Sequence, residues 1–275
     1  MNIKFSIIIP SLNNKDFLKN CLDSILKQTY KNYEIIVMDG GSTDGTKELL
    51  AKYKKKIRYF IEKDRGQSDA INKGIGKSKG NWVTWQNCDD YYYDKNALKI
   101  FYEYIKKNSE KDLFIGNIFL VNKNGEILRD VKYVRPSFLS LLYEDMTLTN
   151  QACFWKKSLN KKLGKMSKMQ INFDLEWFLR ILNLNKNCGH HINKELACYR
   201  IHSQQKTQKQ TTKDISNKIK IKNKYGYKSF FFLPILIYLF IRKTYLHILN
   251  GNFYYILRGI FKFFFIKKNK EYIQK

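Results

Sequence analysis

The sequence has little proline, no closely spaced cysteine pair and no long uninterrupted apolar run, and each shortage excludes a class of protein. Only 3 prolines and 14 glycines occur in 275 residues, which excludes collagen-like and low-complexity chains. The five cysteines contain no Cys-x-x-Cys pair, which disfavours a disulfide framework or a zinc module. No signal peptide is expected, because the apolar stretch after Lys4 ends at Pro10 and a secretory signal is longer.

Acidic residues are also scarce. The chain has 51 Lys or Arg against 24 Asp or Glu, and a formal net charge of +27. Such a balance indicates an anionic partner, which could be nucleic acid, acidic lipid or a phosphorylated substrate. Residues 204–275 are the most biased, with 16 basic residues against two acidic ones. At 44% hydrophobic residues, the chain can nevertheless bury a core.

The first 120 residues alternate between two hydrophobic periods. Short apolar runs typical of buried strands are each followed by apolar residues at helical spacing. The runs are 5–9, 34–38, 57–61 and 82–86, and the helical patterns are 17–26, 44–53, 68–75 and 94–105. This order predicts an α/β fold with a mostly parallel sheet, flanked by helices on both faces.

Polar clusters follow each of these strands, at 11–13, 39–44, 65–69 and 87–90. Ligands bind beyond the carboxyl ends of the strands in such sheets, so we expect the four clusters to meet on one rim. Further along, the pattern predicts a hairpin over 113–131, a strand within 149–155 and a helix over 174–184.

Two of the clusters have chemistry of their own. The run 39–46, Asp-Gly-Gly-Ser-Thr-Asp-Gly-Thr, lets the backbone approach a ligand and opens a helix whose N-terminus favours anions. It could equally be an ordinary capped turn. The run 87–90, Asn-Cys-Asp-Asp, places two carboxylates side by side, as a divalent metal bound to phosphate would require. A surface turn is the alternative.

Seven motifs in order over residues 3–203 closely resemble those of family 2 glycosyltransferases, which have the GT-A fold. They are residues 6–13, 39–46, 66–74, 87–90, 150–154, 174–180 and 199–202. The resemblance implies an inverting transferase that uses a nucleotide-sugar and Mg²⁺ or Mn²⁺. The resemblance does not extend to the tail after residue 205.

The resemblance also implies roles for residues around the donor. Asp39 matches the position that binds uracil, and Asp90 matches the metal ligand. His202 matches a position near the metal and the diphosphate, where it could be a second ligand. The other implied donor residues are Pro10, Ser11 and Asn13 for base and ribose, Asp89 for ribose, Arg65 for the diphosphate, and Asp69 and Asn72 for the sugar.

On the acceptor side, Asp174 matches the general base of the family and Gln151 is expected to face the acceptor. A base contributes roughly 10²–10⁴-fold to such a reaction. Asp174 can also cap the helix that it begins. Glu176 belongs to the same motif, but two residues along a helix it points about 200° away, so the two carboxylates cannot share one role.

The tail after residue 205 combines aromatic and apolar residues with cations. Its best apolar run, 230–241, has 12 residues, whereas a spanning helix takes about 20. We therefore expect a catalytic domain at 1–205 and a basic amphipathic helical tail at 206–275, which holds the enzyme on the anionic, cytoplasmic face of the cell membrane. Helices packed on the catalytic domain, or a homodimer interface, are the alternatives.

The most specific hypothesis is an inverting transfer of a sugar from a UDP-sugar to a hydroxyl of a glycan or lipid-linked glycan, in surface polysaccharide assembly. A nucleotidyltransferase would need a Gly-rich phosphate loop with a reactive Lys or Arg near the first strand, where this chain has Ser11-Leu-Asn-Asn14. A nucleic-acid-binding protein would spread basic and aromatic residues over one folded surface. Here the predicted rim is acidic, so we expect no nucleic-acid partner.

Overall fold

The structure is a computed structural model that describes residues 2–144, 146–205 and 211–258. Its contacts divide the chain into two compact units, Met1–Tyr227 and Lys228–Lys275. The boundary at residue 205 expected from composition therefore lies ahead of helix α8, Thr212–Lys224, which belongs to the first unit.

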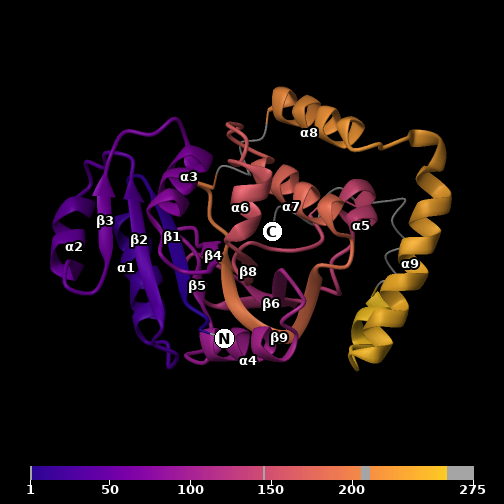
Figure 1. Cartoon of the computed structure of the whole chain (residues 1–275), viewed down its shortest axis with the longest axis horizontal. Coiled ribbons are helices and arrows are strands. Elements are labelled where there is room, and N and C mark those ends of the chain that lie inside the picture. Colours follow the sequence, from indigo (N-terminus) through magenta and orange to yellow (C-terminus); the bar gives the residue numbers. More distant parts are fainter. Residues whose placement is uncertain (1, 145, 206–210, 259–275) are drawn as a thin grey trace. The chain divides into compact units, whose positions relative to one another are not determined.

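The first half of the sheet forms as the hydrophobic periods predict (Figure 1). Four strands run parallel in the order β3-β2-β1-β4, and three helices connect them in sequence. The strands are β1 (Phe5–Ser11), β2 (Tyr33–Asp39), β3 (Arg58–Ile61) and β4 (Trp82–Trp85), and the helices are α1 (Lys15–Leu26), α2 (Thr46–Tyr53) and α3 (Gln67–Lys77). The carboxyl ends of these strands therefore share one edge.

The second half makes the sheet mixed, with nine strands in the described part of the chain. Strand β6 pairs antiparallel with β7, which is the expected hairpin, and with β8. It also pairs in parallel with β9, through a register that shifts around Asn117. The strands are β5 (Tyr91–Tyr92), β6 (Leu113–Val121), β7 (Ile127–Val131), β8 (Cys153–Lys156) and β9 (Gly189–Arg200), and the helices are α4 (Ala97–Lys107), α5 (Phe138–Glu144), α6 (Ser158–Leu163) and α7 (Phe173–Leu184).

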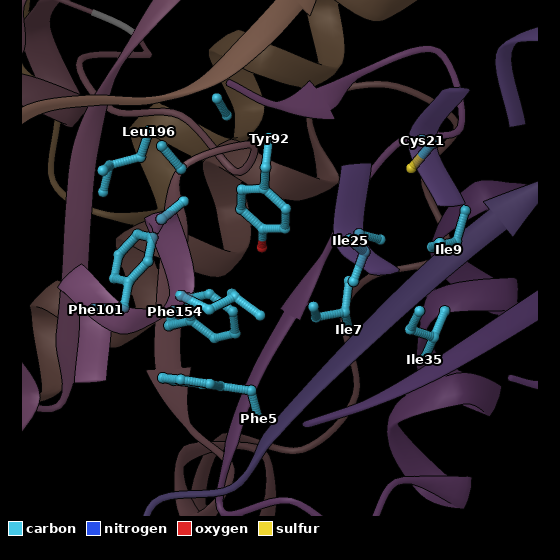
Figure 2. Packing of buried hydrophobic residues seen from close by; sticks show 14 of the residues in the cluster. Phe5, Ile7, Ile9, Cys21, Ile25, Ile35, Tyr92, Phe101, Phe154 and Leu196 are labelled. Atoms are coloured by element: carbon cyan, nitrogen blue, oxygen red, sulfur yellow. The ribbon is translucent and has the colours of Figure 1, made fainter. Parts of the chain in front are cut away.

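Alternate side chains of β1 point to opposite faces of the sheet. Ile7 and Ile9 join a cluster with Cys21 and Ile25 of α1, shown in Figure 2. Phe5 packs on the Phe154 ring at 4.4 Å between centroids. Ile8 points to the opposite face, where α3 covers it. Because the strand is buried on both faces, it has the continuous apolar sequence of a central parallel strand. All five cysteines are buried and unpaired.

The second unit contains a 3₁₀ turn, η2 (Ser229–Phe231), and helix α9 (Phe232–Leu249). The helix continues past Arg242 and Lys243, where the expected run stops. Ser229–Leu249 is long and apolar enough to cross a membrane, judged by length and composition alone. Residues 232–241 are apolar on every side, so this part has no polar face. The remaining tail, 206–210 and 259–275, lies outside the described residues.

Helix α3 lies against β1 so closely that Gly74 leaves no room for a side chain. A Cβ there would lie 2.5 Å from Cγ2 of Ile8 and 3.2 Å from Met38. At Gly76, two residues on, a Cβ would point into open space, with no heavy atom within 4 Å. Substituting Gly74 and Gly76 in turn therefore separates the effect of packing on stability from that of helix propensity, within one helix.

We expect Gly74→Ala to destabilise the protein by about 1–3 kcal/mol, since overpacking outweighs the gain in helix propensity. Gly76→Ala should stabilise it by up to ~1 kcal/mol. Urea unfolding of the two variants and the parent chain measures both. Equal stability of the two variants would contradict the close contact between α3 and β1.

Candidate active site

A cavity of about 410 Å³ opens at the carboxyl ends of β1 and β4. Its walls come from the segments 10–14, 64–70, 87–89 and 199–205. Three of the four polar clusters singled out in the sequence thus contribute directly. The fourth, the 39–44 turn, lies against the wall, because Asn13 donates its N–H to Ser42 Oγ at 2.8 Å and accepts the Thr43 N–H at 2.8 Å.

Asp89 and His202 face each other in the cavity wall. Asp89 Oδ2 and His202 Nε2 are 3.0 Å apart, although they come from the β4–β5 turn and from the segment after β9. The imidazole packs on Phe17, with ring centroids 4.8 Å apart. Both side chains can ligate a divalent cation.

The donor set fits a metal that is shared with a phosphate. Nowhere in the described chain do three or more His, Cys, Asp or Glu residues gather as a metal cluster. Mg²⁺ is commonly held by one or two protein ligands together with substrate phosphates, and it keeps several waters. Two side chains beside an open cavity therefore match such a site, whereas they would not make a closed structural one.

Asp90 does not face the cavity, contrary to its expected position as metal ligand. It is 1% exposed and all its bonds are internal. Oδ2 accepts from Asn87 Nδ2 at 2.9 Å and from Gln151 Nε2 at 2.7 Å, and Oδ1 accepts the backbone N–H of Arg200 at 2.9 Å. Burial and the charge of Asp89 raise the pKa of the Asp90 carboxyl. Asp90 holds the turn, whereas the half-buried carboxylate of Asp89 faces His202 in the cavity wall.

Arg200 is a residue of the site that sequence reasoning did not single out, although it lies in the 199–202 motif. It is 2% exposed. Its Nε donates to the Asp89 carbonyl at 2.9 Å and its Nη1 to the Lys123 carbonyl at 2.6 Å. The guanidinium carbon lies 5.1 Å from the ring centroids of both Phe17 and Tyr91. Carbonyls and aromatic faces thus offset the cost of burying this charge.

The nucleotide residues divide into two groups. Pro10, Ser11 and Asn13 line the cavity as expected, and the buried Ser11 Oγ has no hydrogen-bond partner in the described chain. Asp39 does not line the cavity. Its carboxylate instead accepts the Gly41 N–H at 3.0 Å and the Ser42 N–H at 2.8 Å. It also accepts the Ser42 hydroxyl at 2.6 Å. A carboxylate has about four lone-pair sites, so a uracil contact would use the one that remains.

The residues expected around the diphosphate and sugar are mostly structural. Asp69 accepts the Arg65 N–H at 3.1 Å and pairs with Lys73 at 3.3 Å. Asn72 bonds both backbone groups of Met166, at 3.0 and 2.9 Å. None of Arg65, Asp69 and Asn72 lines the cavity. Their neighbours Asp64, Gly66 and Gln67 do.

Asp174 lies in the first turn of α7 and is half-buried. Its Oδ1 accepts the Leu175 N–H at 2.8 Å. Burial raises the pKa of this carboxyl, while the charge of Lys218 opposes the rise. The chain just before it is bonded to the α3 turn, since Gln170 Nε2 donates to the Arg65 carbonyl at 2.7 Å. Asp174 is therefore tied to the turn whose Gly66 lines the cavity.

Glu176 and Gln151, the other expected acceptor residues, make internal bonds. Glu176 is 6% exposed; it accepts from Arg180 Nε at 3.0 Å and from the Tyr225 hydroxyl at 3.1 Å. Gln151 is buried, and its amide is committed to Asp90 and Thr149. Both side chains therefore hold other parts of the protein in place.

Three comparisons with known proteins bear on this site. The chain is 29% identical over 219 residues to the glycosyltransferase GlyA of Streptococcus pneumoniae, covering 72% of this chain and 30% of GlyA. Its fold resembles TarS 1–349 of S. aureus in complex with UDP-GlcNAc, with TM-score 0.68 and 20% identity, covering 85% of this chain and 70% of that one. It also resembles the mannosyltransferase PcManGT of Pyrobaculum calidifontis in complex with GDP-Man and Mn²⁺, with TM-score 0.62 and 14% identity, covering 92% and 74%.

The chain spans only 19% to 30% of the length of the first curated relatives that it matches. The structural likenesses show the GT-A fold that the motifs imply. The model of glycosyl transferase family 2 matches residues 6–171, which include the strand-end cavity's first three segments. The chain belongs to glycosyl transferase family 2.

Proposed function

We propose that the chain transfers a sugar, with inversion, from a UDP-sugar to a hydroxyl of a glycan or lipid-linked glycan in surface polysaccharide assembly. The pairing of Asp89 with His202 at 3.0 Å in the wall of an open strand-end cavity carries this proposal. The complex of TarS with UDP-GlcNAc supports uridine as the base. The complex of PcManGT with GDP-Man makes guanosine the rival to be tested.

In this proposal Asp89 and His202 hold Mg²⁺ or Mn²⁺. When bound, the metal neutralises the charge that develops on the leaving diphosphate. Ser11, with its free hydroxyl, and Asn13 bind the nucleoside. Asp39 keeps the 39–44 turn in shape against them.

Asp174 is the base in the proposed transfer. The acceptor oxygen attacks C1 of the sugar from the face opposite the diphosphate, the bond from C1 to the diphosphate oxygen breaks, and its electron pair leaves with the diphosphate. The acceptor proton passes to the Asp174 carboxylate. A raised pKa strengthens this base, because proton affinity rises with pKa.

Replacing Asp89 and Asp90 separately tests the proposed metal site and the proposed nucleotide in one set of experiments. We expect Asp89→Asn to remove the Mn²⁺ dependence of UDP binding and to cost at least tenfold in affinity. Asp90→Asn should chiefly lower stability, by about 1–3 kcal/mol, since it disturbs three buried hydrogen bonds. Titration calorimetry with UDP, GDP and dTDP, with Mn²⁺ or EDTA, measures binding.

A clear preference for GDP would contradict the uridine assignment. If Asp90→Asn lost the metal dependence while Asp89→Asn kept it, Asp90 would be the metal ligand, as its place in the motif implies.

We expect Asp174→Asn to slow sugar transfer by roughly 10²–10⁴-fold and to leave UDP affinity within a few-fold. Glu48→Gln, at an exposed acid in the first turn of α2, is the matched control and should change neither. Initial rates and calorimetry measure the two quantities. A nearly normal rate for Asp174→Asn would make the base assignment wrong.

The pH profile of the same reaction reports the raised pKa. Because the base acts as the carboxylate, activity falls as pH drops through the pKa of Asp174. The midpoint of this fall in activity should lie at a pH above the pKa of an ordinary aspartate, about 3.9.

We further propose that helix α9 attaches the enzyme to the inner face of the cell membrane. Its apolar side chains support this, since Leu233 is 63% exposed, Ile237 44% and Ile241 62%. Cations on both sides of the apolar stretch 230–241, Lys228 and Arg242–Lys243, favour an anionic leaflet.

Co-sedimentation of the full chain with vesicles containing phosphatidylglycerol should show binding that partly resists high salt. Ile237→Glu/Ile241→Glu should weaken it at least tenfold. Ile127→Glu/Leu128→Glu, at exposed apolar residues of β7, is the control and should bind normally. A full chain that stays in the supernatant would overturn the attachment, and extraction by carbonate separates surface binding from crossing.

A further inference from the structure

Two lysine-rich stretches flank helix α7, which carries Asp174. Residues 156–173 contain six lysines and no acidic residue, and α8 contains five lysines with Asp214 as its one acidic residue. By contrast, residues 47–64 at the far edge of the sheet contain seven basic and three acidic residues. For their length, both stretches that flank α7 carry more net positive charge than residues 47–64 do.

Hydrogen bonds join both stretches to α7. Arg180 of α7 donates to the carbonyls of Leu163 and Lys165, at 2.7 and 2.9 Å. Asn172, just before the helix, donates to the Asp214 carbonyl of α8 at 3.0 Å. Figure 1 shows α6 beside α7 and α8 beyond the start of α7. Asn172 thus joins α8 to the start of α7, where Asp174 lies, and Arg180 joins residues 163–165 to the second half of the helix.

Four of the six lysines of the first stretch are exposed and have no acidic partner in the described chain. Lys161, Lys162, Lys165 and Lys168 are all exposed, and among the described residues no carboxylate forms a salt bridge with them. Other lysines do have acidic partners: Lys77 pairs with Glu62 at 3.1 Å, and Lys156, at the start of the same stretch, pairs with Asp112 at 2.7 Å. Leaving several like charges unpaired in one place costs self-repulsion, which a bound anion relieves.

The positive field extends to the proposed base. Lys218 of α8 lies close enough to act electrostatically on the Asp174 carboxyl. An acceptor that reaches Asp174 therefore enters the field of Lys218 and lies next to the end of the lysine-rich stretch that leads into α7. Ammonium groups are compact point charges on flexible stems, which suits phosphates that arrive in varied orientations.

Resting on the proposed function, we propose that the acceptor carries phosphate groups near its reactive hydroxyl. They are bound by a lysine surface made of Lys161, Lys162, Lys165, Lys168 and Lys213. A phosphate-bearing glycan or polyol fits this surface, and a neutral sugar does not use it. The same chemistry could come from a phospholipid headgroup, so the test separates the two sources.

The test compares the full chain with Lys161→Gln/Lys165→Gln/Lys168→Gln. The matched control is Lys52→Gln/Lys54→Gln/Lys55→Gln, at exposed lysines around the end of α2. Three readouts are used at low and high salt. They are binding of labelled inorganic polyphosphate by anisotropy, transfer to an alkyl glycoside and to its phosphorylated counterpart, and co-sedimentation with vesicles with and without phosphatidylglycerol.

We expect the parent and control chains to prefer the phosphorylated acceptor at least tenfold in kcat/KM at low salt. The lysine-surface variant should lose that preference and at least tenfold in polyphosphate affinity, with unchanged rates on the neutral acceptor. Equal losses in variant and control would overturn the proposal, and so would a loss confined to vesicles. If neither acceptor is glycosylated but the variant alone loses polyphosphate binding, the proposed function fails and the phosphate site stands.

Discussion

The site depends on one buried cation. The guanidinium of Arg200 lies between two aromatic rings and bonds the carbonyl of Asp89, while its backbone N–H bonds the side chain of Asp90. These bonds fix the turn after β4 to the end of β9, and they determine which of the two adjacent acids turns inward. His202 follows Arg200 by two residues, so the same anchor brings the imidazole to Asp89. Because carbonyls and π-faces hold this charge, the Asp89 carboxylate does not pair with Arg200 and faces His202 instead.

The supporting residues show how a transferase site is built on a sheet edge. Asn72 and Gln170 attach the segment before α7 to the start of α3. Glu176 and Arg180 brace the same segment from the helix side. The result is that the segment leading to Asp174, from the second half of the sequence, is bonded to a turn whose Gly66 lines the cavity. The likeness to TarS extends over 85% of this chain, consistent with a shared framework.

Local patterns predicted the first half of the fold, because the hydrophobic periods of strands and helices can be recognised within short segments of sequence. The common edge of the polar clusters followed, because parallel strands place their carboxyl ends together. Local patterns did not predict β9, whose sequence mixes histidine, asparagine, lysine and glutamate with few apolar residues and whose register shifts around Asn117. Pairing over such distances is decided by packing, not by propensity. The motifs identified the cavity's residues, including Ser11, Asp89 and His202. They assigned the metal to Asp90, whereas the inward orientation of that side chain depends on partners such as Gln151 that are distant in sequence.

The anchor also reaches the tip of the β6–β7 hairpin, since Arg200 donates to the carbonyl of Lys123 and the Tyr91 hydroxyl bonds that of Gly125 at 3.5 Å. Exposed hairpin tips are normally the safest positions for inserting an epitope tag or for opening a chain by circular permutation. In this protein an insertion at 123–125 would disturb Arg200, which holds the turn of Asp89 and Asp90. The hairpin tip thus supports the wall of the cavity, and a label is better placed after α2.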